Sequence, residues 1–313
     1  MNKDNKILFD WLTFSVKIEG FTCDTAIEFL GLTGFEFQTI NGMYGYHDRK
    51  YIEGISIHYN GREDMGVCVE MSGSGLRFFE ENGRGDVKDI IEFIIENQEY
   101  CNITRLDVAY DDFDKLLDLD VICNDVRAYN RVSRFKKIFI QEEFNINSLN
   151  GKTVYCGSKK SDIMFRIYDK KAERGRVDLD HWVRFEIQMR DDRAFCFAEM
   201  IYLNNSINYL FKGVVNNYLR FIKPSDTDSN NWRAEMTDYW KKFIESFDRV
   251  KLTKEGTEYN AERLADFVVK QTMSAAFVFV ELFGEDLYYD LMKLRGGGNL
   301  NSKYRALLDK YNL

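Results

Sequence analysis

The chain has little proline and histidine, and it lacks the cysteine pairs and long apolar runs that mark several protein classes. Its 313 residues include one proline, Pro224, and three histidines. The six cysteines are scattered with no C-x-x-C pair, which predicts free, mostly buried thiols in a reducing cytoplasm. No apolar run reaches the roughly 18 residues of a membrane-spanning helix. The N-terminus has no apolar core or cleavage site of a secretion signal. We therefore expect a cytoplasmic protein without membrane contact.

Other absences concern chemistry. No G-x-x-x-x-G-K-[ST] pattern is present, so no ATPase activity is indicated. The three histidines form no H-x-H pair, which makes a histidine-rich metal site improbable. The glycine-rich segment SGSG (72–75) lacks the spacing of a phosphate-binding loop, and we interpret it as a hairpin turn.

The charge is uneven along the chain. The net charge of −8 argues against generic DNA binding. Residues 127–176, however, hold 13 Lys and Arg against 5 Asp and Glu, a local charge of +8. This segment predicts one basic face on an acidic protein, which can bind phosphates or can simply be a solvated surface.

The pattern of elements indicates two parts. The polar, turn-forming segment KPSDTDSNN (223–231) is the best linker candidate. It divides a mixed part, 1–222, from a part, 232–313, that reads as helices at 232–248, 261–283, 286–294 and 302–311. Strands and helices mix in the first part without a βαβ rhythm, which favours an α+β fold with a largely antiparallel sheet and flanking helices.

The first part is predicted element by element. Strands are expected at 10–18, 55–59, 66–71, 103–110, 135–139, 153–156, 163–169 and 182–189. Helices are expected at 25–30, 87–98, 118–129, 194–204 and 207–221.

Three of these strands have one apolar and one charged face, because alternate residues of a strand share a face. The charged faces carry Arg105, Asp107, Ala109 and Asp111 in the first strand, Met164, Arg166, Tyr168 and Lys170 in the second, and Arg184, Glu186, Gln188 and Arg190 in the third. If the strands share a sheet, these faces converge into one site. The alternative is a solvated sheet face crossed by ion pairs, which needs no function.

The residue types of this face suit phosphoryl transfer. A tyrosine phenol has a pKa near 10, and neighbouring cations favour its phenolate form. A divalent ion held by carboxylates can polarise a phosphate, and carboxylate ligands favour Mg²⁺ or Mn²⁺. Asp111 and Asp112 can add to such a metal site or cap the loop that follows their strand. Tyr110 and Tyr155 are interpreted as structural residues.

At these residues the chain resembles the Rep_trans family of rolling-circle replication initiators and related relaxases of integrative conjugative elements and phages. The matching segments occur in the family's order over about the first 220 residues, and they are ILFDWLTF near the N-terminus, VEMSGSGLRFFE (69–80), ITRLDVAYDD (103–112), YCGSKKSDIMFRIYDKKAER (155–174) and WVRFEIQMRDDRA (182–194).

The resemblance implies a role for each candidate residue. Tyr168 would be the nucleophile that nicks one DNA strand and keeps the 5′ phosphate as a phosphotyrosine ester. Asp107 and Glu186 would hold the metal. Phosphates would be held by Arg105, Lys159, Lys160, Arg166, Lys170, Lys171 and Arg184.

The resemblance also implies a fold and partners. The curved catalytic sheet would be similar to that of the HUH nucleases without their paired histidines. Origin DNA, a host helicase and a second copy of the chain would be the partners. Two other hypotheses remain: an origin-binding protein of the same fold that does not cut, and an unrelated α+β protein with an ion-paired sheet.

Overall fold

The computed structural model describes residues 6–144, 149–203, 205–224, 230–244, 277 and 280–293. The chain divides into two units, Met1–Thr253 and Lys254–Leu313. The described part of the second unit contains the helix α11 (Glu285–Leu291). The helices expected at 261–283 and 302–311 lie almost entirely outside the described residues. Within the described ranges, none of the helices combines the length and the apolar character that crossing a bilayer requires.

The first unit mixes strands and helices, as the sequence predicts, although the structure contains elements that were not predicted. Its strands are β1 (Lys6–Val16), β2 (Gln38–Asn41), β3 (Asp48–Ile52), β4 (Ile55–Tyr59), β5 (Val67–Ser72), β6 (Cys101–Asp112), β7 (Arg131–Ser133), β8 (Ile138–Phe144), β9 (Leu149–Cys156), β10 (Ile163–Asp169), β11 (Val183–Arg190) and β12 (Leu219–Phe221). Its helices are α1 (Cys23–Phe29), α2 (Gly73–Asn82), α3 (Val87–Glu96), α4 (Leu119–Arg127), α5 (Lys170–Glu173), α6 (Asp191–Tyr202), α7 (Ile207–Tyr218) and α8 (Asp238–Ile244), with a 3₁₀ turn at Asn231–Arg233.

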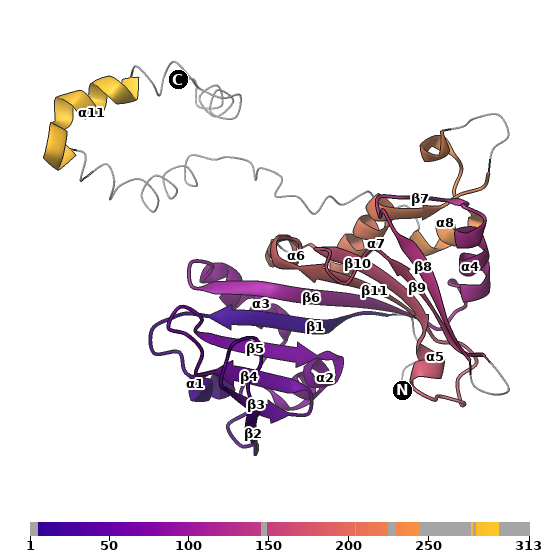
Figure 1. Ribbon diagram of the computed structural model, residues 1–313, viewed down its shortest axis with the longest axis horizontal. Helices are drawn as coiled ribbons and strands as arrows, with labels where there is room; N and C mark the ends of the chain where they lie inside the picture. The colour runs from indigo at the N-terminus through magenta and orange to yellow at the C-terminus, as the bar shows by residue number, and fades with distance from the viewer. Residues whose placement is uncertain are drawn as a thin grey trace. The chain divides into compact units, whose positions relative to one another are not determined.

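Ten of these strands form one sheet in which each described pairing is antiparallel (Figure 1). From the centre outward, the order is β1, β5, β4, β3, β2 on one side and β6, β11, β10, β9, β8 on the other. In each half of the sheet, the strand that comes first in the sequence (β1 or β6) lies at the centre. The strand that comes last in the sequence (β5 or β11) pairs with it. The α+β class with a largely antiparallel sheet is confirmed.

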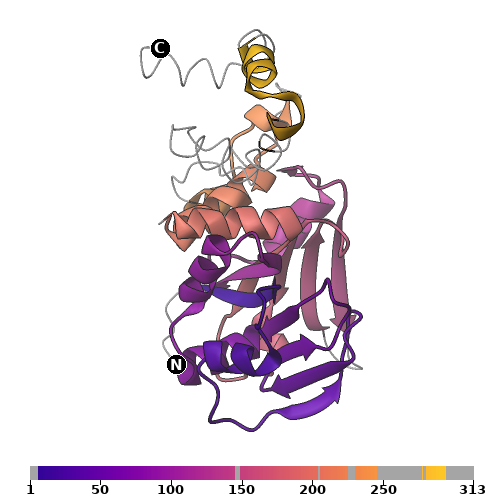
Figure 2. The same ribbon diagram turned by 90° about the vertical axis from the view of Figure 1, so that its left-hand side faces the viewer.

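Apart from the short α5, the helices gather on one face of this sheet (Figure 2), and the apolar sides of the strands face them. Leu106, Val108 and Tyr110 belong to the buried core, as the alternation of β6 predicts. The Tyr110 ring packs against Phe211 of α7 and Phe243 of α8, with ring centroids 6.2 and 5.2 Å apart. The charged sides of the strands are thereby left on the opposite face.

A β-bulge in β1 changes which side chains face the core. Phe9 pairs with Val108 and Trp11 pairs with Asp107, so Asp10 is the extra residue. Before the bulge an odd-numbered residue, Phe9, is buried. After the bulge an even-numbered residue, Leu12, is buried. Bulges re-aim side chains in this way next to functional sites. Here the bulge keeps Asp10 out of the core.

The segment SGSG (72–75) is not a hairpin turn but the start of α2, so our interpretation was wrong. Ser72 is the N-cap and its hydroxyl accepts from the Gly75 amide at 3.4 Å. A Cβ at Gly73 would lie 2.7 Å from Asp10 Oδ1, and one at Gly75 would lie 2.4 Å from the Gly54 carbonyl oxygen. The glycines serve close packing against other strands, which a local turn pattern does not indicate.

Three strands, β12, β2 and β3, also differ from the expectation. The segment 207–221 was predicted as one helix, but α7 ends at Tyr218 and residues Leu219–Phe221 form β12. This strand pairs with β7 in a separate two-stranded sheet, a non-local contact that overrides the helical pattern. The strands β2 and β3 were not predicted, because their residues are half-buried or exposed and lack apolar alternation.

The first unit continues beyond the segment 223–231 that we interpreted as a linker. Trp240 of α8 is fully buried, and its ring lies 4.8 Å from that of Phe221 and 6.2 Å from that of Phe185. Phe243 and Ile244 are buried beside it. α8 is therefore part of the core beneath the central strands, and the boundary between the two units falls after Thr253.

This packing predicts a large stability effect for Trp240→Ala. Removing a buried tryptophan should lower the free energy of unfolding by about 3–5 kcal/mol, measured by urea denaturation. The control is Trp232→Ala, whose side chain is 45% exposed, with an expected change within about 0.5 kcal/mol. Equal effects of the two substitutions would contradict the placement of α8 in the core.

Candidate active site

The three charged strand faces share one sheet, as the sequence analysis required. β6, β11 and β10 are neighbours, and their register places Arg166 opposite Glu186 and Tyr168 opposite Arg184. On the other side of β11, Arg184 lies opposite Asp111. Directly opposite residues in antiparallel strands have side chains in contact range. The register therefore assembles the cluster.

Tyr168 is buried beneath cations and beside a carboxylate. Its side chain is 5% exposed. The Tyr168 hydroxyl donates to Glu186 Oε2 at 3.3 Å and accepts from Lys170 Nζ at 3.3 Å. The Arg166 guanidinium lies 4.8 Å from the centroid of the Tyr168 ring. Burial, followed by the charge of Glu186, raises the pKa of this phenol, so it is protonated at rest.

Lys170 is an unusual lysine because it is buried. It is 4% exposed and forms an ion pair with Glu173, three residues further on in α5. Burial lowers the pKa of its ammonium group, while the hydrogen bond with Glu173 opposes that shift. The Asp169 side chain caps α5 by accepting from the Ala172 amide at 2.8 Å. The cap thus begins the helix directly after Tyr168 and turns Lys170 back toward the phenol.

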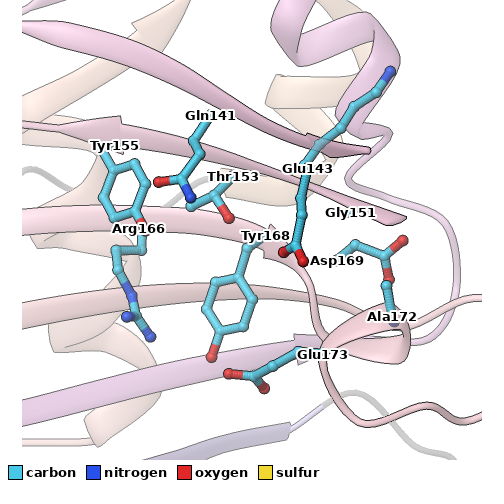
Figure 3. A pocket seen from close by; sticks show the side chains of 11 residues that line it. Gln141, Glu143, Gly151, Thr153, Tyr155, Arg166, Tyr168, Asp169, Ala172 and Glu173 are labelled. Atoms are coloured by element: carbon cyan, nitrogen blue, oxygen red, sulfur yellow. The ribbon is translucent and has the colours of Figure 1, made fainter. Parts of the chain in front are cut away.

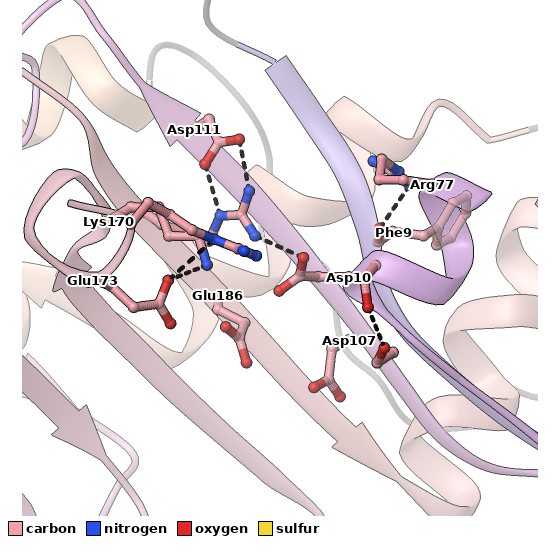
Figure 4. Close-up of polar contacts among 12 residues, drawn as sticks. Phe9, Asp10, Arg77, Asp107, Asp111, Lys170, Glu173 and Glu186 are labelled. Carbon is pink, nitrogen blue, oxygen red and sulfur yellow. Dashed lines mark hydrogen bonds and ion pairs between the residues drawn. The ribbon is translucent and has the colours of Figure 1, made fainter. Parts of the chain in front are cut away.

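Four carboxylates line a cavity of about 240 Å³ at Tyr168: Glu173 of α5 and three that come from the strands. Asp107 comes from β6, Glu186 from β11 and Asp10 from the bulge in β1 (Figure 4). Arg105, Arg166 and Lys170 complete its charged lining. The cavity therefore joins a phenol, acids and cations on one face.

Arginines hold all three of these carboxylates, and the contacts of Arg105 and Arg166 come first. Arg105 Nε donates to Asp107 Oδ1 at 3.0 Å, and its guanidinium lies 4.0 Å from the centroid of the Trp11 ring. Arg166 Nη2 donates to Glu186 Oε2 at 2.7 Å. Burial raises the pKa of Asp107 to about 7; Arg105 lowers it, and the charges of Glu186 and Asp10 raise it further. The buried carboxylates therefore repel one another, and this repulsion favours the protonated form of Asp107.

The same residues fit a hard divalent cation. Carboxylate oxygens are the preferred ligands of Mg²⁺ and Mn²⁺, and a cation would relieve the repulsion that raises the pKa of Asp107. In the described part of the chain, no three acidic, histidine or cysteine side chains already stand around one metal position. Asp107, Glu186 and Asp10 are the residues that could hold the ion.

Arg184 was expected to hold phosphate, but it is buried and fully engaged with carboxylates. Its Nε and Nη2 donate to Asp111 at 2.7 and 2.8 Å, and its Nη1 donates to Asp10 at 2.6 Å. Trp182 Nε1 also donates to Asp111, at 2.8 Å. Arg184 thus connects β11 to both central strands and orients Asp10.

The remaining predicted residues lie elsewhere. Lys159 and Lys160 are exposed in the turn before β10, at the opposite end of that strand from Tyr168. Lys171 is half-buried and does not line the cavity. Asp112 accepts from the Leu117 amide at 2.7 Å, so of the two roles left open it caps the loop.

The sequence analysis missed Asp10 and the residues Ser72, Gly73 and Ser74, which line the same cavity. A carboxylate inside the apolar run ILFDWLTF was the available signal for Asp10, since a charge in a buried strand needs a partner. The residues from 72 to 74 gave no signal, because their position depends on the pairing of β5 with β1.

Comparisons with known proteins agree with this arrangement. Residues 101–293 match the family described as replication initiation factor, Rep_trans, and residues 6–96 match the rolling circle replication initiation protein N-terminal domain. A Bacillus subtilis (strain 168) protein provisionally named DNA relaxase NicK is 26% identical over 288 residues, which is 87% of this chain and 80% of that protein.

A solved structure is also similar. It is that of a rolling circle replication initiator protein from Geobacillus stearothermophilus, with a TM-score of 0.72 and 32% sequence identity. The alignment covers 80% of this chain and 99% of that chain.

The raised pKa of Asp107 predicts a specific pH dependence of stability without metal. Between about pH 4 and 7, folded Asp107 stays protonated while the unfolded carboxyl ionises, so the folded state binds more protons. This residue's contribution should therefore fall as pH rises through that window and level off above about 7. The measurement is urea denaturation with a chelator at several pH values, for the wild type and Asp107→Asn. A difference between the two proteins that does not change with pH would contradict the assignment.

Proposed function

Since the chain belongs to the replication initiation factor family, we propose that it nicks one strand of an origin DNA through a covalent bond to Tyr168. This family consists of rolling-circle initiators and relaxases, which nick DNA for replication or transfer. The observation that carries the proposal is the position of the Tyr168 hydroxyl, hydrogen-bonded to Glu186 and Lys170 at the wall of a cavity that contains further carboxylates and arginines.

The proposed reaction is an in-line attack by the Tyr168 oxygen on the scissile phosphate. The Tyr168 Oη–P bond forms, the P–O3′ bond breaks, and the 3′ oxygen leaves and becomes a free 3′-OH after protonation. Glu186 accepts the hydrogen bond of the phenol and is therefore placed to take its proton. Lys170 donates to the same oxygen and stabilises the phenolate that forms.

Arginine side chains around the cavity are suited to hold the phosphate. The Arg166 side chain is 31% exposed and its Nε has no hydrogen-bond partner among the described residues. The Arg105 side chain is 22% exposed beside Asp107. A planar guanidinium binds phosphate oxygens with two parallel hydrogen bonds. We assign phosphate binding at the cavity to Arg105 and Arg166.

A divalent ion completes the proposal. This family is metal-dependent, and we propose Mg²⁺ or Mn²⁺ held by Asp107 and Glu186, with Asp10 as a third oxygen donor. Bound there, the ion would supply Lewis-acid polarisation of the phosphate. Glu186 Oε2 accepts hydrogen bonds from Arg166 and Tyr168. The other oxygen of the same carboxylate remains to coordinate the metal.

Origin DNA is the partner of this family. We propose that the basic segment 127–176 binds the DNA backbone outside the cavity, with Lys159, Lys160 and Lys171 as contacts. Affinity should then fall steeply with salt because phosphate binding releases counterions. A homodimer and a host helicase, in a cytoplasmic setting, are the further partners that we propose.

A second candidate is an origin-binding protein of the same fold that does not cut. The burial of Tyr168 is the observation that favours it, since the raised pKa of the phenol makes it a weak nucleophile unless its proton is removed. The two candidates differ in one measurable product, the covalent protein–DNA adduct.

The first prediction from this function concerns Tyr168→Phe. Supercoiled plasmid carrying the DNA around the gene, with Mn²⁺, should give open circles bearing covalently attached protein with the wild type. The variant lacks the nucleophilic oxygen, so both products should disappear while DNA affinity stays within about threefold. The assay is gel electrophoresis before and after protease treatment.

Tyr100→Phe is the matched control, because this tyrosine is 48% exposed just before β6 and does not line the cavity, so the variant should keep its nicking activity. Nicking that survives in Tyr168→Phe would move the nucleophile to another residue. Tight binding of the same DNA by the wild type without open circles would favour the non-cutting protein.

The second prediction concerns the metal. Glu186→Gln should weaken Mn²⁺ binding at least about tenfold in titration calorimetry, because a carboxylate ligand is lost. Glu173→Gln removes one negative charge from the same cavity without removing a proposed ligand, and it should change the affinity less than about threefold. Equal losses in both variants would mean that only the overall negative charge of the cavity attracts the ion.

A further inference from the structure

The face that carries Tyr168 continues outward past the nucleophile, across β9 and β8. Opposite Tyr168 on β9 lies Thr153, and opposite Thr153 on β8 lies Gln141. Two residues along, Arg166 lies opposite Tyr155, and Tyr155 lies opposite Phe139. The register therefore places a polar row and an aromatic row side by side, both leading to the active site.

A second cavity, of about 410 Å³, lies over these rows and shares Tyr168 and Arg166 with the first. Figure 3 shows Tyr155, Gln141 and Arg166 gathered on one side of Tyr168. This volume is within the range of small-ligand sites. The nucleophile thus stands at the wall of two cavities, and the carboxylates Asp10, Asp107 and Glu186 line only the first.

Of the aromatic row, Tyr155 lines the second cavity and Phe139 stacks on it from the neighbouring strand β8. The rings of Tyr155 and Phe139 are stacked, with centroids 4.7 Å apart and an angle of 14° between their planes. Phe139 is 47% exposed although it is a large apolar residue. Exposed aromatic faces beside an arginine are the surfaces on which nucleobases stack.

The polar row supplies hydrogen-bonding groups of both kinds. Gln141 presents an amide with donors and an acceptor, and Thr153 presents a hydroxyl. Within the described ranges, neither side chain has a hydrogen-bond partner. A glutamine amide can pair with the edge of a base in a defined geometry. These groups are placed to read a base edge.

The charge of the cavity argues against a phosphate as the occupant. Glu143, Asp169 and Glu173 line it, and Figure 3 shows Glu143 and Asp169 on the other side of Tyr168 from Tyr155. Its lysine, Lys152, already forms an ion pair with Asp120. Acidic groups repel a phosphate but accept hydrogen bonds from the amino group of a base.

We propose that this second cavity is a nucleobase subsite, which binds the base of the nucleotide next to the scissile phosphate. Tyr155 and Phe139 provide the stacking surface, and Gln141 and Thr153 contact the base edge. Tyr168 holds the adjoining phosphate at its hydroxyl, so the base lies one sugar away from the attacked atom. The inference rests on the proposed nicking function and extends it to the choice of cleavage position.

The experiment compares single-stranded oligonucleotides that span the mapped nick. One has all its bases, one is abasic on the 5′ side of the scissile phosphate, and one is abasic on the 3′ side. One of the two abasic substrates should form the covalent adduct roughly 5- to 100-fold more slowly with the wild type, because base–aromatic stacking is lost. The other abasic substrate should react within about threefold of the intact one.

The variants are Gln141→Ala and Phe139→Ala, both at exposed positions, and each should react slowly with the intact substrate. With the sensitive abasic substrate, each variant should react as fast as the wild type does, since the group that it lacks has no base to contact. Gln38→Ala is the matched control, an exposed glutamine on the opposite edge strand β2. It should behave as the wild type with all three oligonucleotides.

Binding measured with Tyr168→Phe protein separates the two proposals. Fluorescence anisotropy of the same three oligonucleotides needs no cleavage, and the sensitive abasic site should weaken binding by a similar factor. Equal affinity and equal adduct formation for all three substrates would overturn the subsite and leave the nicking function intact. Adduct formation that fails with every substrate, while binding discriminates the abasic site, would overturn the nicking function alone.

Discussion

The interaction on which the site depends is the buried contact of Arg184 with two carboxylates. Its guanidinium reaches Asp111 on β6 and Asp10 at the bulge of β1, from the neighbouring strand β11. A buried arginine with all its partners in place is not by itself a strong source of stability, but the loss of one partner leaves an unpaired buried charge at a cost of about 3–5 kcal/mol. The contact therefore favours a single arrangement of the three strands β1, β6 and β11. It fixes the register of β11 against β6, and through that register it places Glu186 and Tyr168.

Electrostatics then explain how an acidic protein can hold a phosphate-directed nucleophile. The chain carries a net charge of −8, and the cavity itself is lined by four carboxylates. Burial favours the neutral form of both Tyr168 and Asp107. In the resting state the site therefore combines a protonated phenol with arginines that are paired to acids. A cation and a phosphate together would change that balance, because the cation engages the carboxylates while the phosphate engages the released guanidinium groups. In the mechanism that we propose, the charges of substrate and ion would compensate one another at this site.

Much of this could be predicted from the sequence, because a strand has a period of two. The alternation in β6, β10 and β11 separates Leu106, Val108 and Tyr110 from the charged residues without any knowledge of the fold. Non-local features could not be predicted. The role of Asp10 depends on a bulge that exists only where β1 pairs with β6. Ser72 begins a helix whose glycines have no room for a side chain, because Gly54 and Asp10 of other segments lie too close to them. The contact of Arg184 with Asp111 likewise follows from a strand pairing, which the family resemblance that suggested a phosphate-binding role for Arg184 does not show.

The position of the site in the sheet explains why both matched regions of the chain are needed. Tyr168, Glu186 and Asp107 come from residues 101–293, the part that matches the replication initiation factor family. Asp10 and the residues from Ser72 to Ser74 come from residues 6–96, the separate N-terminal match. The two regions supply the two halves of the sheet, which meet where β1 pairs with β6. The cavity lies across that seam, so neither half contains the complete set of carboxylates. The outer cavity, by contrast, is lined by residues from 141 to 173 of the second half. The proposed reacting centre is thus shared between the halves, whereas the proposed nucleobase subsite belongs to one half and could diverge without disturbing the seam.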